Sequence, residues 1–230
     1  MDRERRPLDF ARQVGRLREP FDFNVLDGME CRAGLDLAYR DDVAALVLAF
    51  RVDDAYCLVP FFWLPANGNR DLSRPPFDRW VRDGLIETTP GNSTDFAAIR
   101  KRINELGQRV RITKLAVDPW NGRQLASELI EDGFEVLEFA QTLRNFNEPC
   151  KTFEALLAGG KIRHGGNPVL RWMASNVCVE SDSSGNYRPS KKKSNEKIDG
   201  VVAMLMGLAQ YLTEPAAFRS IYEDRGLLVI

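Results

Sequence analysis

Ala33-Gly34-Leu35-Asp36-Leu37-Ala38-Tyr39 is the stretch that decides the fold. It has the composition of a buried strand, yet it carries one carboxylate, Asp36. An ionised carboxylate in an apolar setting is costly unless it is paired or binds a metal. Two other carboxylates lie in similar positions, Asp118 after an apolar run and Asp199 at the start of another. Because each stands where an apolar segment meets a turn or a helix start, we expect the three to act together.

Three strand patterns surround Asp36 and predict an antiparallel meander. They cover Cys31–Tyr39, Val43–Val52 and Ala55–Phe62, are rich in Val, Leu and aromatic residues, and are separated by Asp-rich turns. Pro60 predicts that the third strand lies at a sheet edge near its end, because proline cannot donate to a neighbouring strand.

After the meander, the sequence predicts helices that alternate with strands. Residues 63–93 are rich in Pro and Gly and predict an irregular segment with a short helix over Phe77–Arg82. The spacing of apolar residues then predicts a helix from Phe96 to Gly107, a strand over 109–117, a helix after Asn121-Gly122 that buries Leu125, Leu129 and Ile130, and a strand over 134–139. A strand–helix–strand order predicts parallel pairing through a helical crossover.

The last third of the sequence predicts mainly helices. They lie near 153–157, at 169–175 and at 198–212, with a small hairpin formed by 177–180 and 186–188. The final helix is apolar on most sides and is therefore buried, and Asp199 lies in its first turn, where the helix dipole favours a negative charge. A meander, a β-α-β unit and terminal helices together predict an α/β, ribonuclease H-like fold. Its mixed sheet would combine an antiparallel meander with parallel strands and be flanked by helices. We expect residues 1–30 to be an N-terminal arm or linker, with a short helix at Leu8–Leu17, and residues 31–230 to be the domain.

Composition narrows the class of protein. The 230 residues are 44% hydrophobic and 28% charged, with a net charge of −1, so any affinity for nucleic acid must come from local basic patches. No apolar run reaches the length needed to cross a bilayer, and no signal peptide is visible. The four cysteines are far apart and form no C-x-x-C pair, which favours reduced core thiols and a reducing cytoplasm.

An ordered set of short motifs resembles the nuclease domain of tailed-bacteriophage terminase large subunits over roughly residues 30–230. The motifs are Gly34-Leu35-Asp36-Leu37, Pro60-Phe61-Phe62-Trp63-Leu64-Pro65, Asp118-Pro119-Trp120, His164–Met173, Asn176-Val177, Lys197–Ala203 and Tyr222–Leu227. The resemblance implies an endonuclease that cuts concatemeric viral double-stranded DNA during genome packaging. It also implies that Asp36, Asp118 and Asp199 are catalytic, metal-binding acids. Apart from the resemblance, Asp41 and Asp42 are expected to shape the hairpin turn, with Asp42 as a further candidate metal ligand.

The implied chemistry uses two Mg²⁺ or Mn²⁺ ions. Hydrolysis of a phosphodiester needs an activated water and a neutralised leaving oxygen, and two hard ions held by carboxylates supply both. By resemblance, the expected partners are double-stranded DNA, a terminase ATPase domain, the small terminase subunit and the portal, in the cytoplasm of the bacterial host and without a membrane.

Basic residues predict a path for DNA. Lys191, Lys192, Lys193 and Lys197 lie just before Asp199, where they would contact phosphates without sequence preference. Arg100–Arg102 is expected to be a solvated helix face. His164 is the only histidine; it is a candidate DNA contact, although a structural role is the stronger expectation. The four tryptophans are expected in the core.

Two alternatives stay open. The chain could be another ribonuclease H-like nuclease of the resolvase or transposase type, or an inactive module that docks to a packaging complex. The motifs between the acids favour a terminase, and retention of all three acids favours activity. Gly160-Lys161 is followed by Ile162 and lacks the spacing of a phosphate-binding P-loop. We therefore expect no ATPase activity, whether the chain is an excised domain or a shortened gene product.

Overall fold

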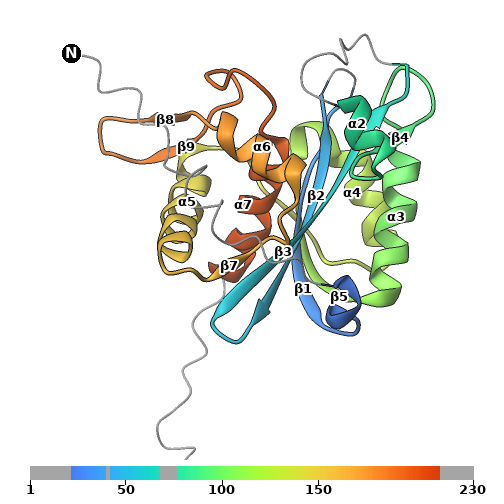
Figure 1. The fold of residues 1–230 in the computed structure, drawn as a ribbon, viewed down its shortest axis with the longest axis horizontal. Helices are drawn as coiled ribbons and strands as arrows, with labels where there is room; N and C mark the ends of the chain where they lie inside the picture. Colours follow the sequence, from blue (N-terminus) through green and yellow to red (C-terminus); the bar gives the residue numbers. More distant parts are fainter. Residues whose placement is uncertain (1–21, 40–41, 68–76, 213–230) are drawn as a thin grey trace, which may run out of the picture.

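The computed structural model describes residues 22–39, 42–67 and 77–212, which form one α/β unit (Figure 1). The elements in chain order are η1 (Phe23–Leu26), β1 (Glu30–Asp36), β2 (Ala44–Val52), β3 (Ala55–Pro65), α2 (Phe77–Arg82), β4 (Glu87–Thr89), α3 (Phe96–Arg109), β5 (Arg111–Val117), α4 (Pro119–Glu131), β6 (Val136–Glu138), α5 (Leu143–Ala158), β7 (Ile162–Arg163), α6 (Pro168–Asn176), β8 (Val179–Ser181), β9 (Tyr187–Pro189) and α7 (Asp199–Leu212).

The central sheet is mixed, as the sequence predicted. Its strand order is β4-β3-β2-β1-β5-β6, with β7 also paired to β3. The pairs β1–β2 and β2–β3 are antiparallel, whereas β5 is parallel to both β1 and β6. The meander and the β5-α4-β6 unit therefore share the sheet, and the carboxyl ends of β1 and β5 meet at the same edge.

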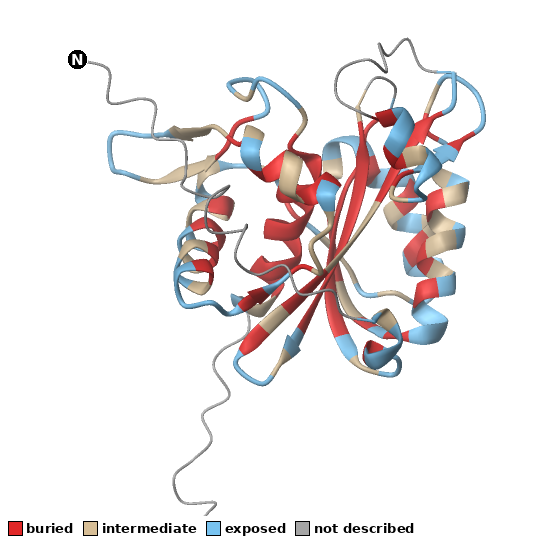
Figure 2. Ribbon diagram, viewed as in Figure 1, coloured by how far each residue is buried: buried red, intermediate tan, exposed pale blue. Residues whose placement is uncertain are grey.

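Helices cover both faces of the sheet. Helices α5, α6 and α7 lie on one face and α3 and α4 on the other (Figure 1). Each face buries its own apolar cluster, one built on α7 and the other on Ile99, Ile103, Leu125 and Leu129 of α3 and α4. The strands between them and most of α7 are buried (Figure 2). The prediction that the last helix is buried is therefore confirmed.

Helix α7 crosses β1 at an unusually short distance. A Cβ atom added to Gly34 would lie 2.0 Å from the carbonyl oxygen of Ala203 and 2.6 Å from the backbone nitrogen of Gly207. Gly207 in turn faces the backbone of β1, where an added Cβ would lie 3.0 Å from the nitrogen of Gly34. Two glycines therefore let a strand and a helix touch backbone to backbone.

Most predicted elements are confirmed, including the helix over Phe77–Arg82 and the small β8–β9 hairpin. The prediction that the third strand lies at a sheet edge near its end was wrong, since Trp63–Pro65 pair with β4. Among the described strands, only β2 pairs with β3 at Pro60, which lies between the residues that pair with β7 and those that pair with β4. All four cysteines are free thiols, three of them buried.

Several expectations were wrong. Helix α3 continues past Gly107, and α4 begins at Pro119 so that Asn121-Gly122 lies inside it. Ile130 is 57% exposed and Trp120 is 90% exposed, although both were expected in the core. Apolar composition does not reveal which side of a short amphipathic helix a terminal residue will occupy.

Some expectations fall outside the described residues, namely the helix at Leu8–Leu17 and the segment Tyr222–Leu227. Within the described ranges, helices are too short or too polar to cross a membrane.

The contact between β1 and α7 yields the first prediction. Gly34→Ala should destabilise the protein by about 1–3 kcal/mol or more, because the new methyl meets backbone atoms that cannot rotate away. Urea unfolding followed by circular dichroism measures the change.

Gly107→Ala is the matched control. Its added Cβ meets only the ring of Phe134 at 2.9 Å, and alanine favours the helix that surrounds it. Equal stability losses in the two variants would contradict the proposed importance of the Gly34 contact.

Candidate functional site

Asp36 and Asp199, which are distant in the sequence, meet around one ammonium group. Asp36 is the last residue of β1 and Asp199 the first residue of α7. The Nζ atom of Lys191 lies 2.7 Å from Oδ2 of Asp36 and 2.6 Å from Oδ1 of Asp199. The structure thus brings together two of the three acids that the sequence predicted, and it places a cation between them.

Both carboxylates are buried, with 2% of Asp36 and 1% of Asp199 exposed. The packing of α7 against β1 fixes their backbones, and Gln141 donates from Nε2 to Oδ1 of Asp36 at 3.0 Å. The Lys191 side chain is 38% exposed, so it reaches the acids from the solvent side. The pair is therefore held rigidly and is open in one direction.

Burial determines the electrostatics of this pair. Loss of solvent raises the pKa of Asp199 to about 7 and also raises the pKa of Asp36, while the charge of Lys191 opposes both shifts. For Lys191, burial would lower the pKa, but the two carboxylates outweigh it and raise the pKa. The charge of Lys191 therefore favours the ionised form of both acids and offsets part of the effect of burial.

Asp42 lies at the border of the same site. Burial opposes its ionisation, yet Lys197, whose Nζ is 3.0 Å from Oδ1, holds the pKa of Asp42 below its usual value. The negative charge of Asp42 in turn raises the pKa of both Asp36 and Asp199. A cavity of about 270 Å³ lies here, lined by Asp42, Lys191, Ser194–Ile198 and Asp199.

Asp118 follows β5, the strand beside β1. Leu35 pairs with Val117, so Asp36 and Asp118 occupy corresponding places at the ends of two parallel strands. The Asp118 side chain accepts a hydrogen bond from the backbone N–H of Trp120 at 3.2 Å and so caps α4. Among residues 22–39, 42–67 and 77–212, no three His, Cys, Asp or Glu side chains form a group that could hold a metal ion.

The donor set nevertheless fits a hard divalent ion. Two buried carboxylates already share one positive charge, and carboxylate oxygens are the ligands that Mg²⁺ and Mn²⁺ prefer. Lys191 therefore stands where a metal ion would have its closest protein ligands. Asp42 borders the position, and Asp118 is one strand away.

The other predicted site residues are distributed differently. Lys192 and Lys193 are exposed beside the site, whereas Lys191 and Lys197 are ion-paired to acids. His164 is buried and lines a small apolar cavity with Leu58 and Phe153, which favours a structural role. Arg100 and Arg102 form ion pairs with Asp132 and Glu105 on the outer side of α3, as expected of a solvated face.

Sequence reasoning missed Gln141 and the acid contacts of Lys191. Gln141 follows β6 directly after Phe139-Ala140, so a polar residue just past a strand end was the available signal. Lys191 was expected to face DNA. Nothing in its lysine run distinguishes the one side chain that turns toward the acids.

Comparison with known proteins now identifies the family. Residues 10–214 match the family described as terminase large subunit, endonuclease domain. The large terminase subunit of Enterobacteria phage HK97 is 37% identical over 182 residues, which cover 76% of this chain and 36% of that protein. Protein YmfN of Escherichia coli (strain K12) is 26% identical over 199 residues, which cover 80% of this chain and 44% of that protein.

Solved structures of terminases are also similar to this chain. The crystal structure of the HK97 large terminase superposes with a TM-score of 0.78 at 33% identity, covering 89% of this chain and 43% of that chain. The large terminase nuclease of thermophilic phage G20c with bound magnesium shares the fold, with a TM-score of 0.60 at 12% identity over 89% of this chain and 96% of that chain. The chain spans less than half the length of the curated relatives named above. It belongs to the family of terminase large subunit endonuclease domains.

Proposed function

We propose that this domain is a metal-dependent endonuclease that cuts concatemeric viral double-stranded DNA during genome packaging. The observation that carries the proposal is the buried pair Asp36 and Asp199, which shares one cation at the mouth of a cavity. Membership of the terminase endonuclease family supplies the substrate class. The G20c relative with bound magnesium supports the use of a divalent ion.

The residues have distinct roles in this proposal. Asp36 and Asp199 would hold the metal, with Asp118 and Asp42 completing the set of ligands for two Mg²⁺ or Mn²⁺ ions. When bound, such ions lower the pKa of a water molecule and neutralise the leaving oxygen of a phosphodiester. Gln141 orients the carboxylate of Asp36 through its hydrogen bond. The packing of β1 on α7 fixes the spacing between the two buried acids.

Lys191 holds the site together before metal arrives. Its ammonium compensates two buried charges that would otherwise repel each other. Asp36 and Asp199 would hold a divalent ion at the place where the Lys191 ammonium lies, and Lys191, with its half-exposed side chain, would contact a DNA phosphate when it does not pair with the acids.

Lys192 and Lys193 would follow the DNA backbone beside the acids, with contacts that depend on charge and not on base sequence. The expected partners are duplex DNA, a terminase ATPase domain, the small terminase subunit and the portal, in the cytoplasm of the bacterial host.

The principal test is cleavage. The purified chain should nick plasmid DNA in Mn²⁺ or Mg²⁺ and stop in EDTA. Asp36→Asn and Asp199→Asn should each slow cleavage on the order of 100-fold, because each removes one charge that positions the metal. Cleavage that persists in EDTA would contradict the metal mechanism.

Asp118→Asn separates catalysis from capping. Asparagine caps a helix as well as aspartate does, so the melting temperature should stay constant while cleavage falls. Glu131→Gln, which removes an exposed charge at the end of α4, should change neither. Normal cleavage by Asp118→Asn would make Asp118 a cap and not a ligand.

Lys191→Met tests the cation between the acids. Without metal it leaves two buried carboxylates uncompensated and should lower the stability by about 1–3 kcal/mol. Mn²⁺ should then raise its melting temperature more than that of the wild type, because no ammonium has to be displaced.

Lys192→Met is the control for this variant, since it removes an exposed charge from the neighbouring position. Thermal melts of all three proteins in EDTA and in Mn²⁺ give the comparison. A Lys191→Met melt that equals the Lys192→Met melt in EDTA would show that the contact does not stabilise the domain.

The DNA path has its own test. Lys192→Ala combined with Lys193→Ala should weaken duplex binding and reduce the slope of log K against log salt by about 0.9 for every phosphate that the variant no longer binds. Lys101→Ala with Lys151→Ala removes the same charge from the outer sides of α3 and α5 and should leave the slope nearly unchanged. Equal slopes in both double variants would mean that only net charge matters.

A further inference from the structure

Trp120 projects from the protein beside the proposed site. It follows Asp118 and Pro119 in the first turn of α4 and is 90% exposed. Exposing an indole of this size has a cost in water, because the ring offers a large apolar surface. Among the described residues, the other tryptophans are buried or partly buried. Trp120 is therefore the feature that the fold itself does not explain.

The backbone under Trp120 is firmly held. Gly122 packs against β5 so closely that an added Cβ would lie 2.3 Å from Cγ1 of Val117. Asn121 donates from Nδ2 to the carbonyl oxygen of Leu37 at 3.3 Å, which ties the start of α4 to the chain that leaves β1. The indole thus extends from a fixed platform close to the ends of both acid-bearing strands.

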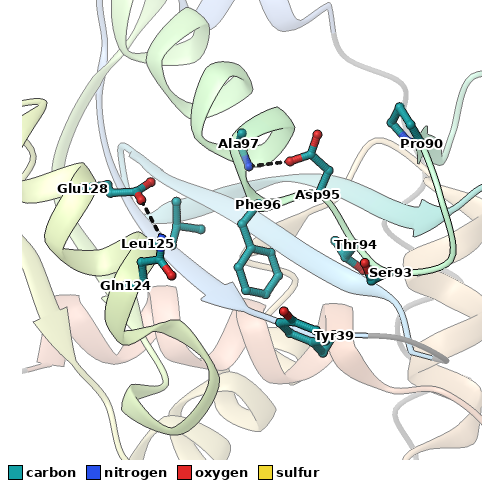
Figure 3. Close-up of a pocket in the computed structure, with 10 residues that line it drawn as sticks. All are labelled: Tyr39, Pro90, Ser93, Thr94, Asp95, Phe96, Ala97, Gln124, Leu125 and Glu128. Atoms are coloured by element: carbon teal, nitrogen blue, oxygen red, sulfur yellow. Dashed lines mark hydrogen bonds between the residues drawn. The ribbon is translucent and has the colours of Figure 1, made fainter.

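Trp120 has suitable neighbours for a nucleic acid. Arg123 is exposed and lies three residues further along α4, hence on the same side of the helix. Tyr39, which comes just after β1, is 63% exposed and packs edge-on against Phe96 with ring centroids 5.7 Å apart. Gln124, one turn beyond Trp120, lines a cavity of about 430 Å³ together with Tyr39 (Figure 3).

The residues that line this cavity indicate which kind of ligand could bind beside Trp120. Tyr39 forms one wall, and the lining includes Asp95, whose carboxylate accepts from the N–H of Ala97, and Glu128, whose carboxylate accepts from Gln124 (Figure 3). Carboxylates repel phosphate but can accept hydrogen bonds from the amino groups of bases. Arg123, which is exposed on α4, provides positive charge for a phosphate. Exposed aromatic rings beside this cation fit the bases and the backbone of DNA together.

We propose that Trp120 is a DNA-contacting residue that stacks on a base next to the bond to be cut, with Tyr39 as a second aromatic contact and Arg123 on a phosphate. This inference rests on the proposed nuclease function, since it takes DNA as the substrate. Stacking on an aromatic ring tolerates any base, which suits an enzyme without strong sequence preference. A base must leave its stack for this contact, so the surface would favour DNA that is locally opened at the cut.

Tryptophan fluorescence tests the contact directly. In EDTA, where no cleavage occurs, a short duplex with a central mismatch should quench the wild-type emission, because Trp120 is by far the most exposed indole among the described residues. Trp120→Phe should lose this quenching while keeping most of the affinity, since phenylalanine can still stack. Trp120→Ala should bind about tenfold more weakly.

Ile130→Ala is the matched control. Ile130 is exposed near the other end of α4, about 15 Å along the helix axis, and should leave both affinity and quenching unchanged. Trp120→Ala should fold normally, because its backbone N–H still bonds to Asp118. Circular dichroism melts verify this point.

The outcomes separate this inference from the nuclease proposal. If Trp120→Ala binds mismatched DNA and cuts plasmid as the wild type does, the inference is overturned while the nuclease function stands. If quenching persists in Trp120→Phe, another indole reports the binding and the inference is again overturned. If quenching behaves as expected but the wild type cuts nothing in Mn²⁺, the contact stands and the nuclease proposal fails.

Discussion

The close approach of α7 to β1 is the constraint on which the rest of the structure depends. Gly34 and Gly207 let the backbones of helix and strand touch, so the helix lies directly on the sheet. Asp36 is two residues beyond Gly34, and Asp199 begins the same helix. A larger residue at either glycine would lift the helix away and change the spacing of the acids. The packing of these glycines thus sets the distance between Asp36 and Asp199, on which the proposed chemistry relies. The same contact joins the N-terminal strand β1 to the C-terminal helix α7.

The acids in turn impose a requirement on the segment before α7. Two buried carboxylates at short range are tolerated only with a positive charge between them, and Lys191 supplies it from the turn that follows β9. This turn is therefore part of the site, although it contains no regular structure. A loop so placed can respond to whatever occupies the acids, since its position depends on the ion pairs of Lys191 and Lys197 and on the hydrogen bonds of Ser190 and Ser194.

Much of the fold follows from periodicity in the sequence, because alternation and helical spacing mark which residues face a core. The sequence also singles out Asp36 and Asp199, since a charge inside an apolar run is unusual, and the structure places both side chains buried against Lys191. Asp118 also follows an apolar run, but its side chain caps α4. An aspartate between a strand end and Pro119 is expected equally of a helix cap and of a metal ligand, so the sequence does not distinguish the two roles. Trp120 and Ile130 were misplaced because hydrophobicity reports a residue type and not a direction. The contacts of Lys191 with Asp36 and Asp199 could not be predicted, because an irregular segment has no periodicity from which the direction of a side chain could be inferred.

Pro60 has a consequence for how these domains behave at high concentration. Among the strands that the structure describes, only β2 lies beside the stretch of β3 between its pairings with β7 and β4, so this stretch resembles the edge of an open sheet. Such borders can recruit a strand from another molecule and start intermolecular β-structure. Proline removes a donor at this position, which interrupts the ladder that an incoming strand would need. The residue would thus help to keep copies of the domain from associating through this strand.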